Sequence, residues 1–227
     1  MAMVIKGANP SQVEDANSIM PLEVRESFLP HFIWGLVVVL MLVALTRYSS
    51  ISGRSGIIPS QLATTSTSAN KSATKVQLFI HPRCACTAAT IDQLQSALHA
   101  TPVNCQIPIE IYVFAPESEP ESWYETPLVK QCQSLPDVTV ILDRNGALAK
   151  SLGVATSGHI LVWDGEQKRK FSGGITPSRG HRGPCQGLDA FQAALEGHGY
   201  AALNSAPFGC SIQLQALASD NERPECH

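Results

Sequence analysis

Two cysteines one residue apart, Cys84 and Cys86, are the part of the sequence best suited to chemistry. They follow a short apolar run, 76–80, and precede a segment with helical spacing of apolar residues, 87–100, so they lie where a predicted strand meets a predicted helix. The unpaired amides and the dipole of a helix N-terminus stabilise a thiolate, and Arg83 adds positive charge beside it. Because only the thiolate attacks disulfides, we expect Cys84 to attack and Cys86 to resolve.

The C-x-C spacing is one residue shorter than the familiar C-x-x-C. A disulfide between Cys84 and Cys86 would be more strained, and strained disulfides are more easily reduced. We therefore expect a relatively oxidising pair, or one better suited to isomerisation or to a metal.

The chain after residue 75 alternates apolar, β-branched runs with helical patterns, and these elements must position the cysteines. Strands separated by helices imply parallel pairing, and a closing hairpin supplies an antiparallel edge. In chain order, the predicted elements are strand 76–80, helix 87–100, strand 107–114, helix 119–135, strand 138–142, short helix 147–152, strands 159–163 and 170–173, and helix 188–197.

An uncharged apolar run, 27–46, precedes this domain. At about 1.5 Å per residue it is long enough to cross a hydrocarbon core of roughly 30 Å, and Trp34 and Tyr48 suit the two membrane interfaces. A cleaved signal peptide would need a basic leader and a small-residue cleavage site, and a soluble core helix would need a polar face. We expect an uncleaved single-pass anchor, 27–48, after an N-terminal tail, 1–26.

Residues 49–74 are rich in Ser, Thr, Gly and Ala and predict a flexible tether to the membrane. The folded domain is expected over 75–212, followed by a C-terminal tail, 213–227. Basic residues flank the apolar run on both sides, so charge does not decide the topology. We expect the soluble domain on the extracytoplasmic, periplasmic side.

Composition excludes several classes of protein. The 227 residues carry a formal net charge of −3, which offers no footprint for nucleic acid. Seven cysteines are too few for a disulfide-stapled miniprotein, and their odd number leaves one unpaired in a monomer. Cys105, Cys132 and Cys185 have no motif around them, and two of them could pair; Cys226-His227 is expected to be a frayed end. Common nucleotide-binding, zinc-protease and serine-hydrolase motifs are absent from the sequence.

The order of these elements, with a cysteine pair where the first strand meets the first helix, resembles the thioredoxin fold. As a set, the segments HPRCACTAAT, GVATSGHILVWDGE, FSGGITPSRGH and PFGC resemble the RedB-like family of membrane-anchored thioredoxin-like proteins over 76–210. The resemblance implies an α/β, thioredoxin-like fold, a mixed central sheet flanked by helices, after a single N-terminal transmembrane helix.

The resemblance also points to residues beyond the cysteine pair. Thioredoxin-like proteins place a cis-proline in the loop facing the pair, where it keeps metals away and presents backbone to the substrate. Here Ser157 and Gly158 occupy that loop, with glycine in the proline slot, which makes metal binding easier or simply satisfies a tight turn. His181 and Arg179 could approach the sulfurs from a glycine-rich loop. Cys210 could supply a third redox or ligand thiol, or a structural disulfide.

Three classes of function remain open. The first is a membrane-tethered thiol–disulfide oxidoreductase that acts on protein or small thiols through Cys84, Cys86 and Arg83, needs no dissociable cofactor and is reset by a redox partner. The second is a metal-handling protein in which Cys84, Cys86 and His181 hold a soft ion such as copper. The third is a tethered interaction module without turnover.

Overall fold

The computed structural model describes residues 22–54, 56–61, 74–100, 107–197 and 203–212. The chain divides into two compact units, Met1–Thr46 and Arg47–His227. The predicted tail 213–227 and most of the tail 1–26 lie outside the described residues, as do Cys105 and Cys226-His227.

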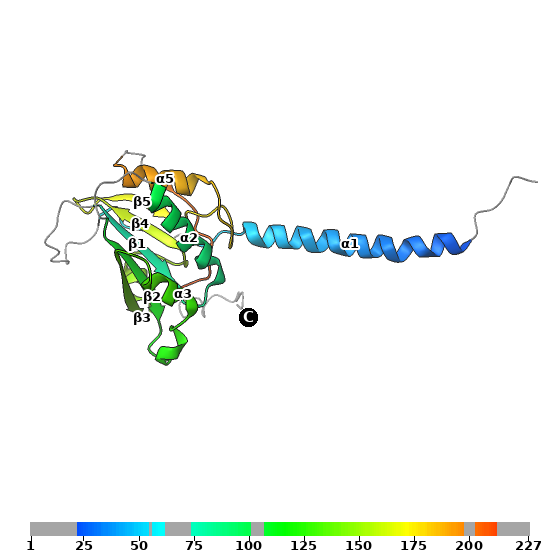
Figure 1. Cartoon of the computed structure of the whole chain (residues 1–227), viewed down its shortest axis with the longest axis horizontal. Helices are drawn as coiled ribbons and strands as arrows, with labels where there is room; N and C mark the ends of the chain where they lie inside the picture. The colour runs from blue at the N-terminus through cyan, green and yellow to red at the C-terminus, as the bar shows by residue number, and fades with distance from the viewer. Residues whose placement is uncertain (1–21, 55, 62–73, 101–106, 198–202, 213–227) are drawn as a thin grey trace, which may run out of the picture. The chain divides into compact units, whose positions relative to one another are not determined.

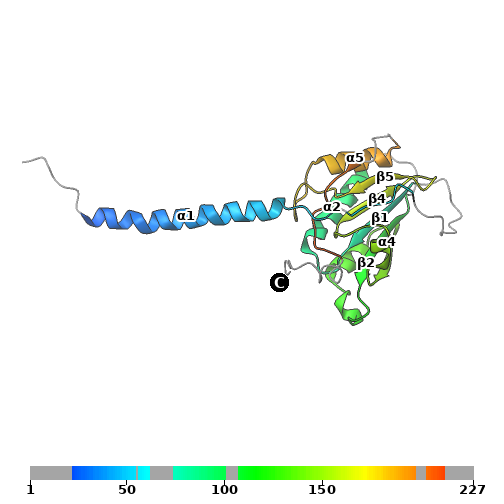
Figure 2. The ribbon, with the colours of Figure 1, turned by 180° about the vertical axis from the view of Figure 1, so that it is seen from behind.

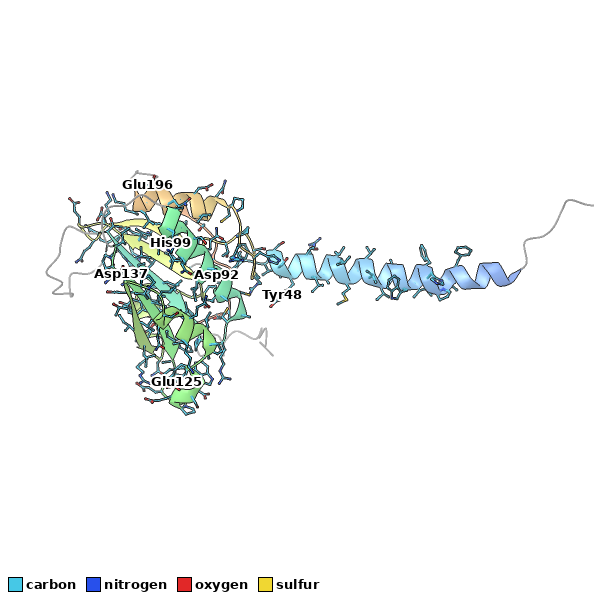
Figure 3. The ribbon with its side chains drawn as sticks, in the orientation of Figure 1. Tyr48, Asp92, His99, Glu125, Asp137 and Glu196 are labelled. Atoms are coloured by element: carbon cyan, nitrogen blue, oxygen red, sulfur yellow. The ribbon has the colours of Figure 1, made fainter. Side chains whose placement is uncertain are left out.

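Helix α1 (Leu22–Ser50) contains the predicted apolar run. Its segment Phe28–Ser50 is long and apolar enough to cross a membrane, and none of it is buried within the protein. Large apolar side chains from Phe28 onward are exposed along the helix (Figure 3). An exposed apolar surface of this length is what a membrane anchor or a signal sequence requires, so the expected N-terminal apolar helix is confirmed.

The unit from residue 47 onward is built on a six-stranded mixed sheet with the order β3-β2-β1-β4-β5-β6 (Figure 1). Strands β1, β2 and β3 are mutually parallel, β4 is antiparallel to β1, β5 is antiparallel to β4, and β6 is parallel to β5. This order and these directions confirm the expected thioredoxin-like α/β fold. The strands are β1 (Lys75–Ile80), β2 (Ile109–Ala115), β3 (Val138–Arg144), β4 (His159–Trp163), β5 (Arg169–Gly173) and β6 (Leu203–Asn204).

Helices cover both faces of the sheet. The helices α2 (Ala85–Ala100), α3 (Pro127–Gln133) and α5 (Gln186–Leu195) lie in front of it in Figure 1, and α4 (Ala147–Ser151) comes into view from behind in Figure 2. Because side chains alternate along a strand, Leu78 of β1 packs in the cluster under α2 and α5, whereas its neighbour Phe79 packs in the cluster under α4. The inner strands β1 and β4 are therefore buried on both faces, whereas the edge strand β3 is largely half-buried or exposed.

Two local features differ from the sequence prediction. The single helix expected over 119–135 is a short 3-10 turn, η1 (Glu121–Trp123), followed by α3. The break arises because Thr126 caps α3 with its side chain and Pro127 occupies the first helical turn, where proline is tolerated. The strand β6, only two residues long, carried no recognisable pattern.

Part of the expected tether 49–74 is bonded to the domain. The Gly53 N–H donates to the Pro207 carbonyl at 2.7 Å, and the Arg169 N–H donates to the Ser60 carbonyl at 3.0 Å. The Arg54 carbonyl accepts from the Thr156 hydroxyl at 2.9 Å. Residues 55 and 62–73 of the expected tether lie outside the described residues.

Candidate functional site

Cys84 is the residue immediately before α2 and forms the start of that helix. Its N–H donates to the His81 carbonyl at 3.0 Å, and its carbonyl accepts from the Thr87 N–H at 3.1 Å. The Thr87 N–H also bonds the Cys84 sulfur, which is the arrangement of a side chain that caps a helix. Cys84 therefore lies at a helix N-terminus, as the sequence predicts. Only 1% of the residue is exposed.

The Cys84 sulfur is surrounded by hydrogen-bond donors from two segments. The Cys210 thiol is the largest influence, and the backbone N–H of Cys210 lies 3.3 Å from the sulfur. The side chain and the N–H of Thr87 add to it. Together these donors outweigh burial and lower the pKa of Cys84 to about 4. Cys84 is therefore a thiolate at neutral pH.

A chain of hydroxyl groups stands behind the thiolate. The Ser157 hydroxyl oxygen accepts from the His81 N–H at 2.8 Å and lies 2.6 Å from the Thr87 hydroxyl. Each hydroxyl has one proton, and the Thr87 proton is directed at the Cys84 sulfur. Ser157 must then donate to Thr87, so the dipoles of the chain all point towards the negative charge, an alignment in which each hydrogen bond strengthens the next.

Cys86 has the opposite electrostatic environment. It is half-buried near the start of α2, and burial and the negative charge of Cys84 both raise the pKa of its thiol, although Arg179 opposes the increase. The two cysteines of the C-x-C pair are therefore unequal at neutral pH, with a thiolate at Cys84 and a protonated thiol at Cys86. Of the two, the residue expected to attack is the one whose pKa is lowered.

The positive charge near the sulfurs comes from Arg179 rather than Arg83. The Arg179 guanidinium bonds the Cys86 side chain and donates to the Gly209 carbonyl at 2.9 Å. The Arg83 guanidinium instead lies 5.2 Å from the ring centre of Trp123 and donates to the Trp123 carbonyl at 3.2 Å. The structure thus brings Arg179 to the pair as anticipated and directs Arg83 to an aromatic ring.

Gly158 occupies a backbone conformation that suits glycine. Its φ is +86°, and its N–H donates to the Phe79 carbonyl at 2.8 Å. A Cβ there would lie 3.0 Å from the Thr90 hydroxyl oxygen. A residue in the left-handed region with a close neighbour is most easily glycine, so the turn accounts for Gly158.

His181 is exposed and makes contacts within its own loop. Its Nδ1 lies 2.7 Å from the Arg179 carbonyl oxygen, and its N–H donates to the Ser178 carbonyl at 3.3 Å. Within the described part of the chain, no group of three or more His, Cys, Asp or Glu side chains is placed to hold a metal ion. These residues therefore give no support to the copper alternative built on Cys84, Cys86 and His181.

His81 and Thr87 belong to the site, although the sequence did not single them out. The His81 ring packs in a mutual cluster with Phe114 and Trp123, whose ring centres lie 5.8 and 5.4 Å from it and 6.2 Å from each other. Burial lowers the pKa of His81, Arg83 adds to that effect and the Cys84 thiolate opposes it. The sequence did hold a signal for Thr87, namely its spacing from Cys84. The residue three positions after a helix cap is the one whose N–H reaches the capping side chain.

The remaining described cysteines lie away from this cluster of donors. Cys132 is fully buried in the core, and burial raises the pKa of its thiol to about 12. Cys185 is half-buried and occupies the position just before α5, where its side chain makes no capping hydrogen bond. The cluster around the Cys84 sulfur therefore contains three thiols, from 84, 86 and 210.

Comparison with known proteins gives structural similarity alone. No family model and no curated protein matches the chain. An uncharacterized conserved protein from Geobacillus kaustophilus is 20% identical, with a TM-score of 0.49 over 78% of this chain and 95% of that one. A hypothetical protein from Sinorhizobium meliloti 1021 is 18% identical, with a TM-score of 0.49 over 73% and 97%. StoA from Bacillus subtilis is 14% identical, with a TM-score of 0.40 over 64% and 98%. Such distant similarities assign neither a substrate nor site residues to this chain.

Proposed function

We propose that this protein is a membrane-tethered, thioredoxin-like thiol–disulfide oxidoreductase in which Cys84 is the nucleophile. The observation that carries the proposal is the environment of Cys84, where donors from Cys210 and Thr87 lower the pKa of the thiol to about 4. Structural cysteines are inert when buried in apolar surroundings, as Cys132 is. A buried cysteine held as a thiolate is instead the arrangement that disulfide exchange requires.

The exchange proceeds in two substitutions at sulfur. The Cys84 thiolate attacks one sulfur of a substrate disulfide, the substrate S–S bond breaks, and the second sulfur leaves as a thiolate. A second protein thiol then loses its proton to solvent and attacks the Cys84 sulfur, which forms a protein disulfide and releases the other substrate thiolate. Cys86 and Cys210 both adjoin Cys84 and supply candidates for this second step.

The low pKa of Cys84 also bears on the direction of electron flow. Hydrogen bonds that stabilise the thiolate stabilise the reduced form of the site, so the corresponding disulfide is a relatively strong oxidant. The reverse sequence of the two substitutions, in which a dithiol substrate reduces the protein disulfide, is therefore the favoured one. A small disulfide or a redox partner must then reoxidise the protein.

Access to Cys84 requires movement of its surroundings. The residue is 1% exposed, whereas Cys86 and Cys210 are half-buried. The segment 209–212 contacts the Cys84 sulfur directly through the Cys210 N–H. A substrate therefore reaches the sulfur when this segment shifts, and burial between turnovers shields the thiolate from unspecific oxidants.

The exposed apolar surface of α1 supports the tether. The large apolar side chains exposed from Phe28 to Leu45 are stable only where lipid or another apolar surface covers them. We place the catalytic domain on the extracytoplasmic side, where dithiols are oxidised to disulfides. Labelling of intact cells with a membrane-impermeant thiol reagent tests this topology, and labelling confined to the cytoplasmic face contradicts it.

The activity is tested with the full chain in detergent. The oxidised protein is mixed with a reduced dithiol peptide, and the loss of peptide thiols is followed with glutathione disulfide present for turnover. Cys84→Ser should abolish the reaction, whereas Cys185→Ser, a half-buried cysteine outside the cluster, should leave it unchanged. Equal activity of the Cys84→Ser variant and the parent would refute the proposal, and a parent without turnover would favour an interaction module.

A further inference from the structure

We propose that Cys210, rather than Cys86, is the resolving thiol, so that the oxidised protein carries a Cys84–Cys210 disulfide. The inference rests on the proposed function and names the partner of its nucleophile. It is carried by the way a short segment far along the chain is held against the Cys84 sulfur.

Segment 209–212 lies antiparallel to residues 155–157, in the loop before β4. The Ser157 N–H donates to the Cys210 carbonyl at 2.8 Å, and the Ile212 N–H donates to the Ala155 carbonyl at 2.9 Å. Between these two bonds, Thr156 and Ser211 form an isolated antiparallel bridge. Cys210 is therefore held in register with the loop that faces the start of α2.

The fit of this segment is close on both sides. A Cβ at Gly209 would lie 2.0 Å from the Ser157 carbonyl oxygen, so only glycine permits this approach. On the other side the Gly209 carbonyl accepts from the Arg179 guanidinium at 2.9 Å. This packing places the backbone of residue 210 so that its N–H bonds the Cys84 sulfur at 3.3 Å.

Cys210 and Cys86 approach Cys84 in different ways. The Cys210 backbone and side chain both bond the Cys84 sulfur, and they come from a separate extended segment. The Cys86 side chain also hydrogen-bonds that of Cys84, but Cys86 lies in the first turn of α2 and offers no backbone bond to the sulfur. A Cys84–Cys86 bond would close a ring over a single intervening residue at the helix start, which strains a disulfide, whereas a bond to Cys210 joins two separate segments already in contact.

The resolving step balances as follows. After Cys84 has formed a mixed disulfide with a substrate sulfur, the Cys210 thiol loses its proton to solvent and attacks the Cys84 sulfur. The bond between Cys84 and the substrate breaks, the substrate leaves as a thiolate with the electron pair, and the Cys84–Cys210 disulfide forms. Two protein thiols are oxidised and one substrate disulfide is reduced to two thiols, while Cys86 stays reduced beside Arg179.

Peptide mapping tests the oxidised state without altering any of the three thiols. Trypsin leaves Cys84 and Cys86 on one peptide, 84–130, and Cys210 on another, 183–227. The full chain in detergent is oxidised with one equivalent of dithiobis(nitrobenzoate) and digested without reductant. We expect the two peptides to be joined, whereas a bond confined to peptide 84–130 overturns the proposal. The chain used retains only the three thiols and carries the substitutions Cys105→Ser, Cys132→Ala, Cys185→Ser and Cys226→Ser.

A kinetic test in the same chain separates the two steps. With one equivalent of dithiobis(nitrobenzoate), attack by Cys84 releases one coloured thiolate and resolution releases a second. Cys210→Ser should release the first thiolate normally and release the second at least about 100-fold more slowly, because it lacks the intramolecular thiol that is positioned to attack the mixed disulfide. Cys86→Ser should release both as the three-thiol chain does. Circular dichroism of each variant confirms that it is folded.

Each other outcome is decisive. If Cys86→Ser retains the mixed disulfide while Cys210→Ser releases both thiolates, Cys86 resolves and the proposal is wrong, although the oxidoreductase function stands. If both variants release two thiolates, or both release only one, the specific role of Cys210 is refuted. If Cys84→Ser releases the first thiolate as fast as the three-thiol chain, the proposed function itself fails.

Discussion

Replacement of Thr87 by valine should raise the pKa of Cys84 by a measurable amount. Valine keeps the shape of the side chain and the backbone N–H, but it removes the hydroxyl that donates to the Cys84 sulfur. The change also leaves the Ser157 hydroxyl without the acceptor that lies 2.6 Å away. Thr87 is fully buried, so water does not replace the lost donor.

The size of the effect follows from the charge on the acceptor. A hydrogen bond to a charged group contributes about 1.5–3 kcal/mol, and one pKa unit corresponds to about 1.36 kcal/mol. Loss of the Thr87 hydroxyl should therefore raise the pKa of Cys84 by about 1 to 2 units from its value of about 4. The donors from Cys210 remain, so the pKa should stay below that of an ordinary cysteine.

The measurement is a pH titration of the thiolate by its ultraviolet absorbance, using the reduced full chain in detergent. Thr90→Val is the matched control, because Thr90 is equally buried in α2 and lies one turn beyond Thr87. Its substitution should leave the pKa of Cys84 at about 4. An unchanged pKa in Thr87→Val, or an equal rise in both variants, would refute the hydrogen-bond explanation.

Three further predictions concern the surroundings of the thiolate. Gly209→Ala should push segment 209–212 away from the Ser157 carbonyl, which a Cβ would approach to 2.0 Å. The change should raise both the pKa of Cys84 and its rate of alkylation, and an unchanged alkylation profile would contradict this. Arg179→Gln should raise the pKa of Cys86 further, since the guanidinium opposes that rise, whereas Arg182→Gln on the exposed part of the same loop should not; mass spectrometry of Cys86 alkylation against pH distinguishes them. The folded pKa of Cys84 lies below the ordinary value of 9.0, so its stabilisation of the fold is complete above that value and is lost as the pH falls towards about 4. The difference in melting temperature between the parent and Cys84→Ser should shrink over that range, and a constant difference would exclude this linkage.

Much of the fold follows from local sequence pattern. The apolar run at the N-terminus, strands β1 to β5 and the helix that follows Cys84 are each set by composition and periodicity within one segment. The break in the helix expected over 119–135 was missed because a single cap, Thr126 followed by Pro127, outweighs a weak helical pattern. The hydrogen bond from Gly53 of the tether to Pro207 could not be predicted, because local sequence does not record a partner more than 100 residues away. The order of the strands in the sheet is what brings the two residues together.

The sequence by itself determined that Cys84 stands at the start of a helix, because a strand, a turn and a helix adjoin it in the chain. It could not determine which groups make that thiol a thiolate. Cys210, which bonds the Cys84 sulfur, is 126 residues away, and Arg179 takes the place beside the thiols that the adjacent Arg83 was expected to fill. A thiol's pKa depends on donors and charges within a few ångströms, and only the folded chain brings those together.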